Sequence, residues 1–317
     1  MGRMTATDES DTPAPDRLGQ YVQRLDDGRE LPMFSGQMLA LLSLSIEEST
    51  AARKLVELVG EDYALTCKVL QIANSFHFNR SNQPIESLTH AILVLGAGTV
   101  QNLASTLACF QASDQRPVIL QHLMVRSMVS AQVASVTAEV SGFTEREVTY
   151  LAGMLQNLGE ILVAHHSPVQ HAAIEGHVKA GHSREDATLK ELGFTFDDLA
   201  RVIGRRWKLS PRVCSLWDVG SASTDLTMLA RFANELTRVM TLGAPASRKA
   251  GVSLLLMRYG WSLRLTAEEI AEVWDRAVGE TRETFDSAGV SVGSLGLPTV
   301  NPAARGNNHG PSPYIAV

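Results

Sequence analysis

Residues 150–166 carry a regular pattern of apolar and polar positions, and the rest of the chain can be organised around them. Apolar side chains recur there at spacings of three and four, which is typical of a helix buried along one broad face. These side chains are Leu151, Met154, Leu155, Leu158, Ile161, Leu162 and Ala164. Two neutral amides, Gln156 and Asn157, lie in the middle of this stretch. The pattern predicts a core helix over residues 150–166.

The same helical spacing recurs between residues 17 and 288, and no alternation of strand length is sustained anywhere. We therefore expect an all-α fold with almost no sheet. Asp62 is placed to cap a helix whose apolar face includes Phe76, and Ser87 is placed to cap the next helix. Thr144 and Glu147 have the spacing of a capping box, which predicts a helix start just before the 150–166 segment.

The chain is predicted to form two packed helical subdomains, residues 17–112 and 113–288. The first 16 residues are polar and acidic, and residues 289–317 are rich in Gly, Pro, Asn and Ser with a single charge. Such compositions bury too little apolar surface to offset the entropy lost on folding. We expect both tails to be disordered.

The composition restricts the classes of partner and the compartment. The 317 residues include 28 basic and 34 acidic ones, giving a net charge of −6 without a basic stripe, so duplex nucleic acid is not an expected partner. No segment resembles a secretory signal or reaches the roughly 18 uninterrupted apolar residues of a membrane span. Cys67, Cys109 and Cys214 have no metal-ligand spacing and are expected to be buried free thiols. These features predict a cytoplasmic protein.

A run of motifs resembles the HDOD family, the HD-related output domain of bacterial signalling proteins. In that family a Leu-Pro pair precedes a helix of the form D-x-x-L-x-x-K-x-L-x-x-A-N-S, followed by A-I-x-x-L-G. This chain supplies Leu31, Pro32, Asp62, Leu65, Lys68, Leu70, Ala73, Asn74, Ser75, Ala91, Ile92, Leu95 and Gly96. Weaker matches continue through Leu158 and Gly159 to Trp217. The resemblance implies an all-α bundle of the HD type in a noncatalytic regulatory protein.

The resemblance also implies where a metal site would lie in a true HD hydrolase. Such a site needs a histidine from one helix, a histidine–aspartate pair from a second, and a further carboxylate, which together hold a cation that activates water. Alignment to the motif places Gln156 and Asn157 at the pair, and Arg126 near the first histidine. A guanidinium there would repel a divalent ion by several kcal/mol. We therefore expect a vestigial HD site at Arg126, Gln156 and Asn157, with no catalytic residue, metal or cofactor.

Five histidines cluster after this helix, at His165, His166, His171, His177 and His182. Adjacent histidines on a helix point about 100° apart. No acidic or cysteine residue is spaced along the sequence to complete a tetrahedral set around them. The sequence favours histidines that interact with a helix C-terminus and do not bind metal.

The polar loop that follows the Asn-Ser motif is the candidate interaction surface. Its residues are Asn74, Ser75, His77, Phe78 and Arg80, with His77, Phe78 and Arg80 expected to be most exposed. The resemblance implies partners that bind in trans, such as receiver, kinase or cyclic-dinucleotide-turnover proteins. Two alternatives remain open: a divergent metal-dependent phosphohydrolase, and a nucleotide sensor that uses the vestigial pocket.

Overall fold

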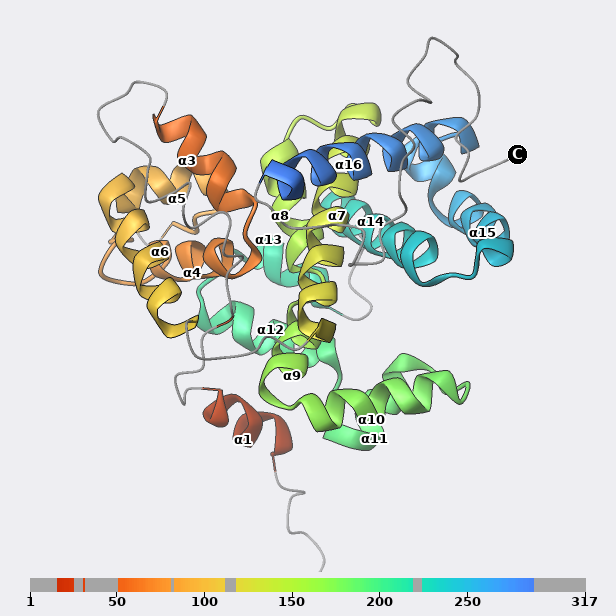
Figure 1. Ribbon diagram of the computed structural model, residues 1–317, viewed down its shortest axis with the longest axis horizontal. Helices are drawn as coiled ribbons and strands as arrows, with labels where there is room; N and C mark the ends of the chain where they lie inside the picture. Colours follow the sequence, from red (N-terminus) through yellow and green to blue (C-terminus); the bar gives the residue numbers. More distant parts are fainter. Residues whose placement is uncertain are drawn as a thin grey trace, which may run out of the picture.

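The computed structural model describes residues 16–25, 31, 51–80, 83–111, 118–218 and 224–287. Within these ranges every element is a helix and no strand occurs, which confirms the expected all-α fold (Figure 1). The elements are α1 (Arg17–Arg24), α3 (Ala51–Gly60), α4 (Tyr63–Ala73), α5 (Leu88–Leu95), α6 (Ala97–Gln111), α7 (Val118–Val140), α8 (Arg146–Leu155), α9 (Leu158–His166), α10 (Pro168–Lys179), α11 (Arg184–Leu192), α12 (Phe196–Arg206), α13 (Pro211–Cys214), the 3₁₀ helix η1 (Ser215–Trp217), α14 (Asp225–Leu242), α15 (Pro245–Leu263) and α16 (Ala267–Ser287). The C-terminal tail, the N-terminal tail before Asp16, and the subdomain boundary at residue 112 lie outside the described residues.

Helices α3 to α6 pack against one another on one side of the molecule (Figure 1). Two of them begin where the sequence predicts. Asp62 accepts a hydrogen bond from the Leu65 backbone N–H at 2.8 Å, and Ser87 accepts one from the His90 N–H at 3.1 Å. Phe76, however, does not extend the apolar face of α4, because that helix ends at Ala73. Its side chain is 79% exposed, so that prediction is wrong.

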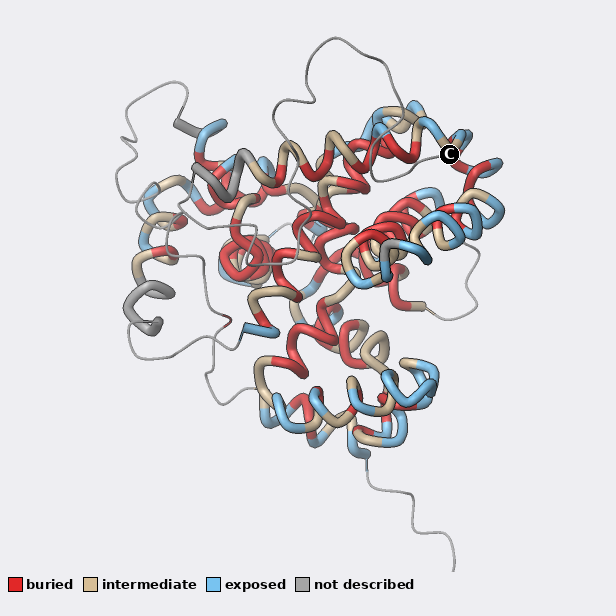
Figure 2. Tube along the Cα trace, turned by 45° about the vertical axis from the view of Figure 1, so that its right-hand side comes forward, coloured by how far each residue is buried: buried red, intermediate tan, exposed pale blue. Residues whose placement is uncertain are grey.

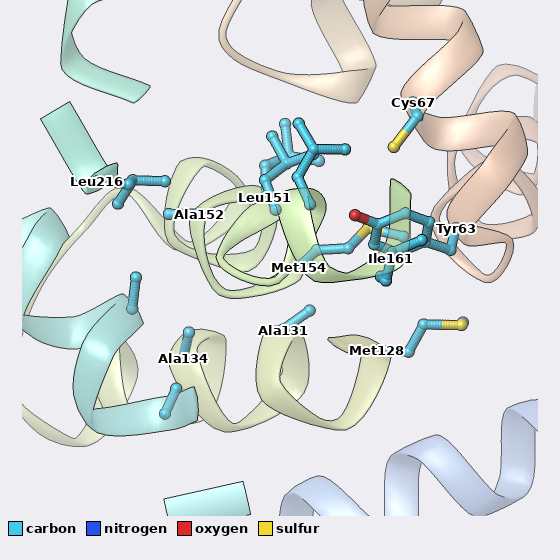
Figure 3. Packing of buried hydrophobic residues seen from close by; sticks show 14 of the residues in the cluster. Tyr63, Cys67, Met128, Ala131, Ala134, Leu151, Ala152, Met154, Ile161 and Leu216 are labelled. Carbon is cyan, nitrogen blue, oxygen red and sulfur yellow. The ribbon is translucent and has the colours of Figure 1, made fainter. Parts of the chain in front are cut away.

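The central helix is α7, which is buried along most of its length and packs against α8, α14 and α16 (Figure 2). Small residues let α7 and α8 approach closely. A Cβ atom at Gly153 would lie 2.7 Å from the Ser130 carbonyl oxygen and 2.8 Å from Ala134 Cβ. Figure 3 shows Ala131, Ala134 and Ala152 among the larger side chains of this core. Because the two helices meet almost backbone to backbone, they fix the position of the residues that follow α8.

The region predicted as one core helix over residues 150–166 is two helices, α8 and α9, separated at Gln156 and Asn157. The apolar spacing is correct, since the predicted core positions are buried. The periodicity of apolar residues does not show the break, because the break depends on hydrogen bonds to residues distant in the sequence. The Gln156 carbonyl accepts from Trp217 Nε1 at 3.4 Å, and the Asn157 side chain binds groups on α7 and α14.

The predicted capping box before α8 is also wrong. This helix begins at Arg146, after Glu145, and no side chain caps it. Glu147 instead accepts a hydrogen bond from the Thr89 backbone N–H at 2.7 Å. Its carboxylate therefore joins α8 to the start of α5, a long-range contact that the local motif does not reveal.

Asn74 joins the end of α4 to the segment before α5. Its side-chain N–H groups donate to the carbonyls of Leu70 at 3.0 Å and Ile85 at 3.2 Å, and its side-chain oxygen accepts from the Ile85 N–H at 2.9 Å. The residue is only 2% exposed. Asn74 is therefore a buried structural residue, although the sequence left open whether it was part of an interaction surface.

Replacing Asn74 with alanine is expected to destabilise the protein by about 2–3 kcal/mol, because the Ile85 N–H and its carbonyl lose their buried partner. Chemical unfolding of both variants would measure this. Asn79→Ala, which removes a more exposed loop hydrogen bond to Gln83, is the matched control and should cost about 0.5 kcal/mol or less. Equal losses for the two variants would contradict the structural role of Asn74.

Candidate functional site

The break between α8 and α9 lies at the centre of the molecule, where the amides of the vestigial HD motif meet two other helices. The Asn157 side-chain N–H donates to Ser127 Oγ on α7 at 3.2 Å and to Asn234 Oδ1 on α14 at 2.9 Å. Gln156 Oε1 is buried and has no hydrogen-bond partner among the described residues. Asn157 therefore belongs to a neutral polar network, and the side-chain oxygen of Gln156 beside it is left available as an acceptor.

Glu160, one turn after Asn157, is the principal charged group of the site, and the sequence analysis did not identify it. Its carboxylate is buried and lies 3.1 Å from Arg184, 3.4 Å from His171, 3.7 Å from Arg238 and 3.9 Å from Arg126. Burial alone would raise the pKa of this carboxyl, but the hydrogen bond from His171 and the three guanidinium groups lower it to about 2. Glu160 is therefore ionised at any physiological pH.

The motif alignment placed Arg126 near the position of the first HD histidine. The structure places its guanidinium beside Glu160, while the next residue, Ser127, contacts Asn157. Burial lowers the pKa of Arg126 and also that of Arg238, with Glu160 acting in the opposite direction. Among the described residues these two guanidinium groups form only the long ion pairs to Glu160 and no hydrogen bond.

A pocket of about 370 Å³ opens beside this cluster. One face of α14 supplies four of its lining residues at helical spacing, and the remainder come from the break and from the starts of α9, α11 and α12. The lining residues are Gln156, Asn157, Glu160, Arg184, Phe196, Asp197, Arg231, Asn234, Glu235 and Arg238. Burial raises the pKa of Asp197 to about 6, although Arg231 and Arg201 act to lower it. The pocket is thus polar and lined by both arginines and carboxylates.

The sequence shows no acidic residue spaced to complete a tetrahedral set around the histidines, but the fold brings two carboxylates close to His171. Its ring and the carboxylates of Glu160 and Glu175 place potential ligand atoms within 4.8 Å of one another. A cation is nevertheless poorly suited to this group. Arg184 already contacts both carboxylates, Glu160 at 3.1 Å and Glu175 at 2.8 Å. A divalent ion would also face Arg126 and Arg238 at close range, which opposes its binding electrostatically.

The amide network fits a metal no better. Mg²⁺ and Ca²⁺ favour several carboxylate or carbonyl oxygens, and Zn²⁺ and Fe²⁺ favour imidazole. The Asn157 side chain instead donates its N–H groups to a hydroxyl and to a second amide. The remaining histidines have other partners or lie elsewhere: His177, for example, is 2.8 Å from Glu191. The described residues around the break are therefore arranged as a salt cluster with a neutral amide network, in which Arg184 already engages the Glu160 and Glu175 carboxylates.

The candidate interaction loop is only partly as predicted. His77 and Arg80 are exposed and Ser75 is half-buried. Phe78 is also half-buried and packs against the core, so the expectation that it is among the most exposed residues is wrong. The exposed aromatic is instead Phe76, whose ring lies 5.8 Å from Lys208 Nζ. The accessible part of this loop is therefore centred on Phe76, His77 and Arg80.

A comparison with protein families matches the HDOD domain to residues 31–219, more than half of the chain. The chain therefore belongs to the HDOD family, as its motifs predicted. No curated protein matches it significantly. Among the described residues, no helix is sufficiently long and apolar to cross a membrane.

Solved structures with a similar fold include a virulence factor from Campylobacter jejuni subsp. jejuni, with 15% identity and a TM-score of 0.59 over 84% of this chain and 97% of that one. The MmoQ response regulator from Methylococcus capsulatus has 18% identity and a TM-score of 0.57 over 71% of this chain and 92% of that one. An HDOD domain protein of unknown function from Geobacter sulfurreducens has 19% identity and a TM-score of 0.45 over 86% and 98%. The two higher scores support the shared fold.

Proposed function

We propose that this HDOD protein is a noncatalytic signal-transduction module that regulates other proteins by binding them in trans. The observation that carries the proposal is the chemistry at the vestigial HD site. Three arginines surround Glu160, and a neutral amide network occupies the adjacent position. A hydrolase would need a cation there to activate water. The family membership and the response regulator of similar fold agree with a signalling role.

The first rival is a divergent phosphohydrolase that has rebuilt a metal site from Glu160, His171 and Glu175. Arg184 argues against it, because its guanidinium contacts both carboxylates that such a site would need. Metal content and turnover separate the two functions directly.

The exposed loop gives a test of binding in trans. Receiver, kinase and cyclic-dinucleotide-turnover proteins are the proposed partner classes, and Phe76, His77 and Arg80 are the accessible residues. Changing all three to serine should reduce partner recovery in a quantitative pull-down by about tenfold if they include an interface hot spot. Leu93→Ser, a change of another exposed apolar residue in the same half of the chain, should leave recovery unchanged. Equal recovery with the triple variant would count against this surface.

A second candidate function, an anion or nucleotide sensor, is favoured by one specific feature of the pocket. Arg238, which lines the pocket, and Arg126, which lies beside the same Glu160 carboxylate, retain unused N–H donors. Buried polar groups normally find partners, and a guanidinium fork matches phosphate oxygens. A ligand with a phosphate group would satisfy these donors.

Sensing can be tested by thermal shift with pyrophosphate and with purine nucleotides as probes. A probe at 100 times its dissociation constant should stabilise the protein by about 2.7 kcal/mol. Arg238→Lys keeps the charge beside Glu160 but loses the planar fork, so the shift should shrink. Arg276→Lys, which alters a surface ion pair to Glu139, should respond like the wild-type protein. If no probe moves the midpoint, the sensor function is contradicted.

A further inference from the structure

Helix α15 presents an apolar stripe that nothing in the described structure covers. Leu254, Met257 and Trp261 follow one another at spacings of three and four, which places them on one face of the helix. Their exposed fractions are 66%, 83% and 94%. The opposite face packs inward through Val252, Leu255, Tyr259 and Leu263, all of which are buried. Figure 1 places α15 at the edge of the molecule, beside α14 and α16.

This stripe stands out against the other exposed apolar residues of the described surface. Single exposed apolar side chains are normal, whereas contiguous ones indicate an interaction site. Trp, Met and Arg are also the residues enriched at protein interfaces. A groove of about 680 Å³ adjoins Trp261 and is lined in part by Leu256, Gly260 and Leu265. An exposed anchor beside a groove is the arrangement expected of an interface hot spot.

The charges on α15 indicate the character of the partner. Residues 245–265 contain Arg248, Lys249, Arg258 and Arg264 but no acidic residue, in a chain whose net charge is −6. Lys249 and Arg264 are exposed, and Arg264 also lines the groove. Arg258 lies beside the stripe but is ion-paired with Glu235 at 2.9 Å, so Lys249 and Arg264 supply most of the positive charge. The apolar stripe is therefore bordered by positive charge.

We infer that the α15 stripe is a docking surface for an acidic protein segment, whose apolar side chain enters the groove beside Trp261 while its carboxylates meet the flanking cations. This inference rests on the proposed function, because it names a second surface, in addition to the loop at Phe76, through which the module would bind a partner. Complementary charge steers association and excludes wrong partners, while the apolar anchors provide most of the affinity.

Two other occupants fit the surface less well. In a symmetric dimer the same patch faces itself, so Lys249 and Arg264 of one copy would lie near the same cations of the other. An anionic membrane would attract the flanking cations, but a lipid surface has no side chain to place in the groove. A protein partner satisfies the stripe, the groove and the charges together.

The full-length protein can be tested with a labelled amphipathic peptide that carries leucines on one face and glutamates beside them. Fluorescence anisotropy should show binding to the wild-type protein, and Met257→Ser with Trp261→Ser should weaken it by about tenfold or more. Val169→Ser alters an apolar residue on α10 that is 82% exposed, and should bind like the wild-type protein. Lys249→Glu should also weaken binding. No binding of the peptide, or equal binding by the double variant, would overturn the inference.

The other occupants are outcomes of the same experiment. Preferential binding to phosphatidylglycerol vesicles would overturn the inference and indicate a lipid surface. Self-association that depends on protein concentration and is lost in the double variant would overturn it and indicate a second copy of the chain.

Pull-downs from the native cell separate this inference from the proposed function. If the wild-type protein recovers no partner, the proposed function fails. If identified partners bind the double variant and the wild-type protein equally, the function stands and the inference about α15 fails.

Discussion

Replacing Gly159 with alanine is expected to destabilise the protein by at least about 3 kcal/mol, which is an unusually large effect for adding one methyl group. A Cβ atom at this position would overlap the carbonyl oxygen of Phe196 and lie 2.7 Å from its carbonyl carbon. The obstacle is backbone, so no side chain can rotate to relieve it. Helices α9 and α12 would have to separate, and the pocket between them would lose its shape.

Gly176→Ala is the matched control for this change. Gly176 lies inside α10, and a Cβ atom there meets nothing within 4 Å. Alanine should therefore stabilise that helix by about 0.5–1 kcal/mol. Urea unfolding of the two variants measures the contrast. A Gly159→Ala protein as stable as the wild type would show that α9 and α12 do not meet at this point.

The second large effect is expected for Glu160→Gln, with a loss of about 3–5 kcal/mol, because removing one partner leaves buried charges uncompensated. Arg126, Arg184 and Arg238 would then repel one another without the carboxylate between them. Glu139→Gln is the control. Glu139 also contacts two arginines, Arg146 and Arg276, but it lies on the surface, where solvent screens the charges. The control should therefore change stability little.

The pH dependence of stability gives an independent test of the Glu160 cluster. The pKa of Glu160 falls from its ordinary value of 4.5 to about 2 in the folded protein. A lowered pKa in the folded state stabilises the protein above the unfolded-state pKa, and this stabilisation is lost as pH falls through the folded value. It amounts to about 3 kcal/mol at neutral pH. The stability difference between wild type and Glu160→Gln should therefore shrink between pH 4.5 and pH 2, and a difference that grows with acid would contradict the ionised cluster.

The sequence predicted the helices well because their signals are local. The spacing of apolar residues placed the core positions of α8 and α9, and the capping residues Asp62 and Ser87 fixed two helix starts. Local signals failed where distant residues decide the structure. The break at Asn157 depends on Ser127, 30 residues earlier, and on Asn234, 77 residues later.

The candidate site was predicted only in part, for the same reason. The HDOD resemblance located Gln156 and Asn157, which line the pocket, and Arg126, which lies beside Glu160. It could not reveal Glu160, since the residues that give this carboxylate its importance come from four separate helices. One signal was available in the sequence: Arg231, Asn234, Glu235 and Arg238 form a polar stripe along the otherwise apolar α14. Periodicity alone would place such a polar helix face toward solvent. In the structure this face lines the pocket, so it marks a site.

The central claim is that the HD-like site of this protein carries out no metal-dependent hydrolysis. The most direct measurement is elemental analysis of the purified full-length chain, combined with turnover of phosphoesters and cyclic dinucleotides with added Mg²⁺ or Mn²⁺, before and after chelation. The account predicts no stoichiometric metal and no turnover that depends on it. The account would be contradicted by stoichiometric metal together with turnover that is lost on chelation. In that case Glu160→Gln should also lose the turnover, whereas Glu139→Gln should retain it.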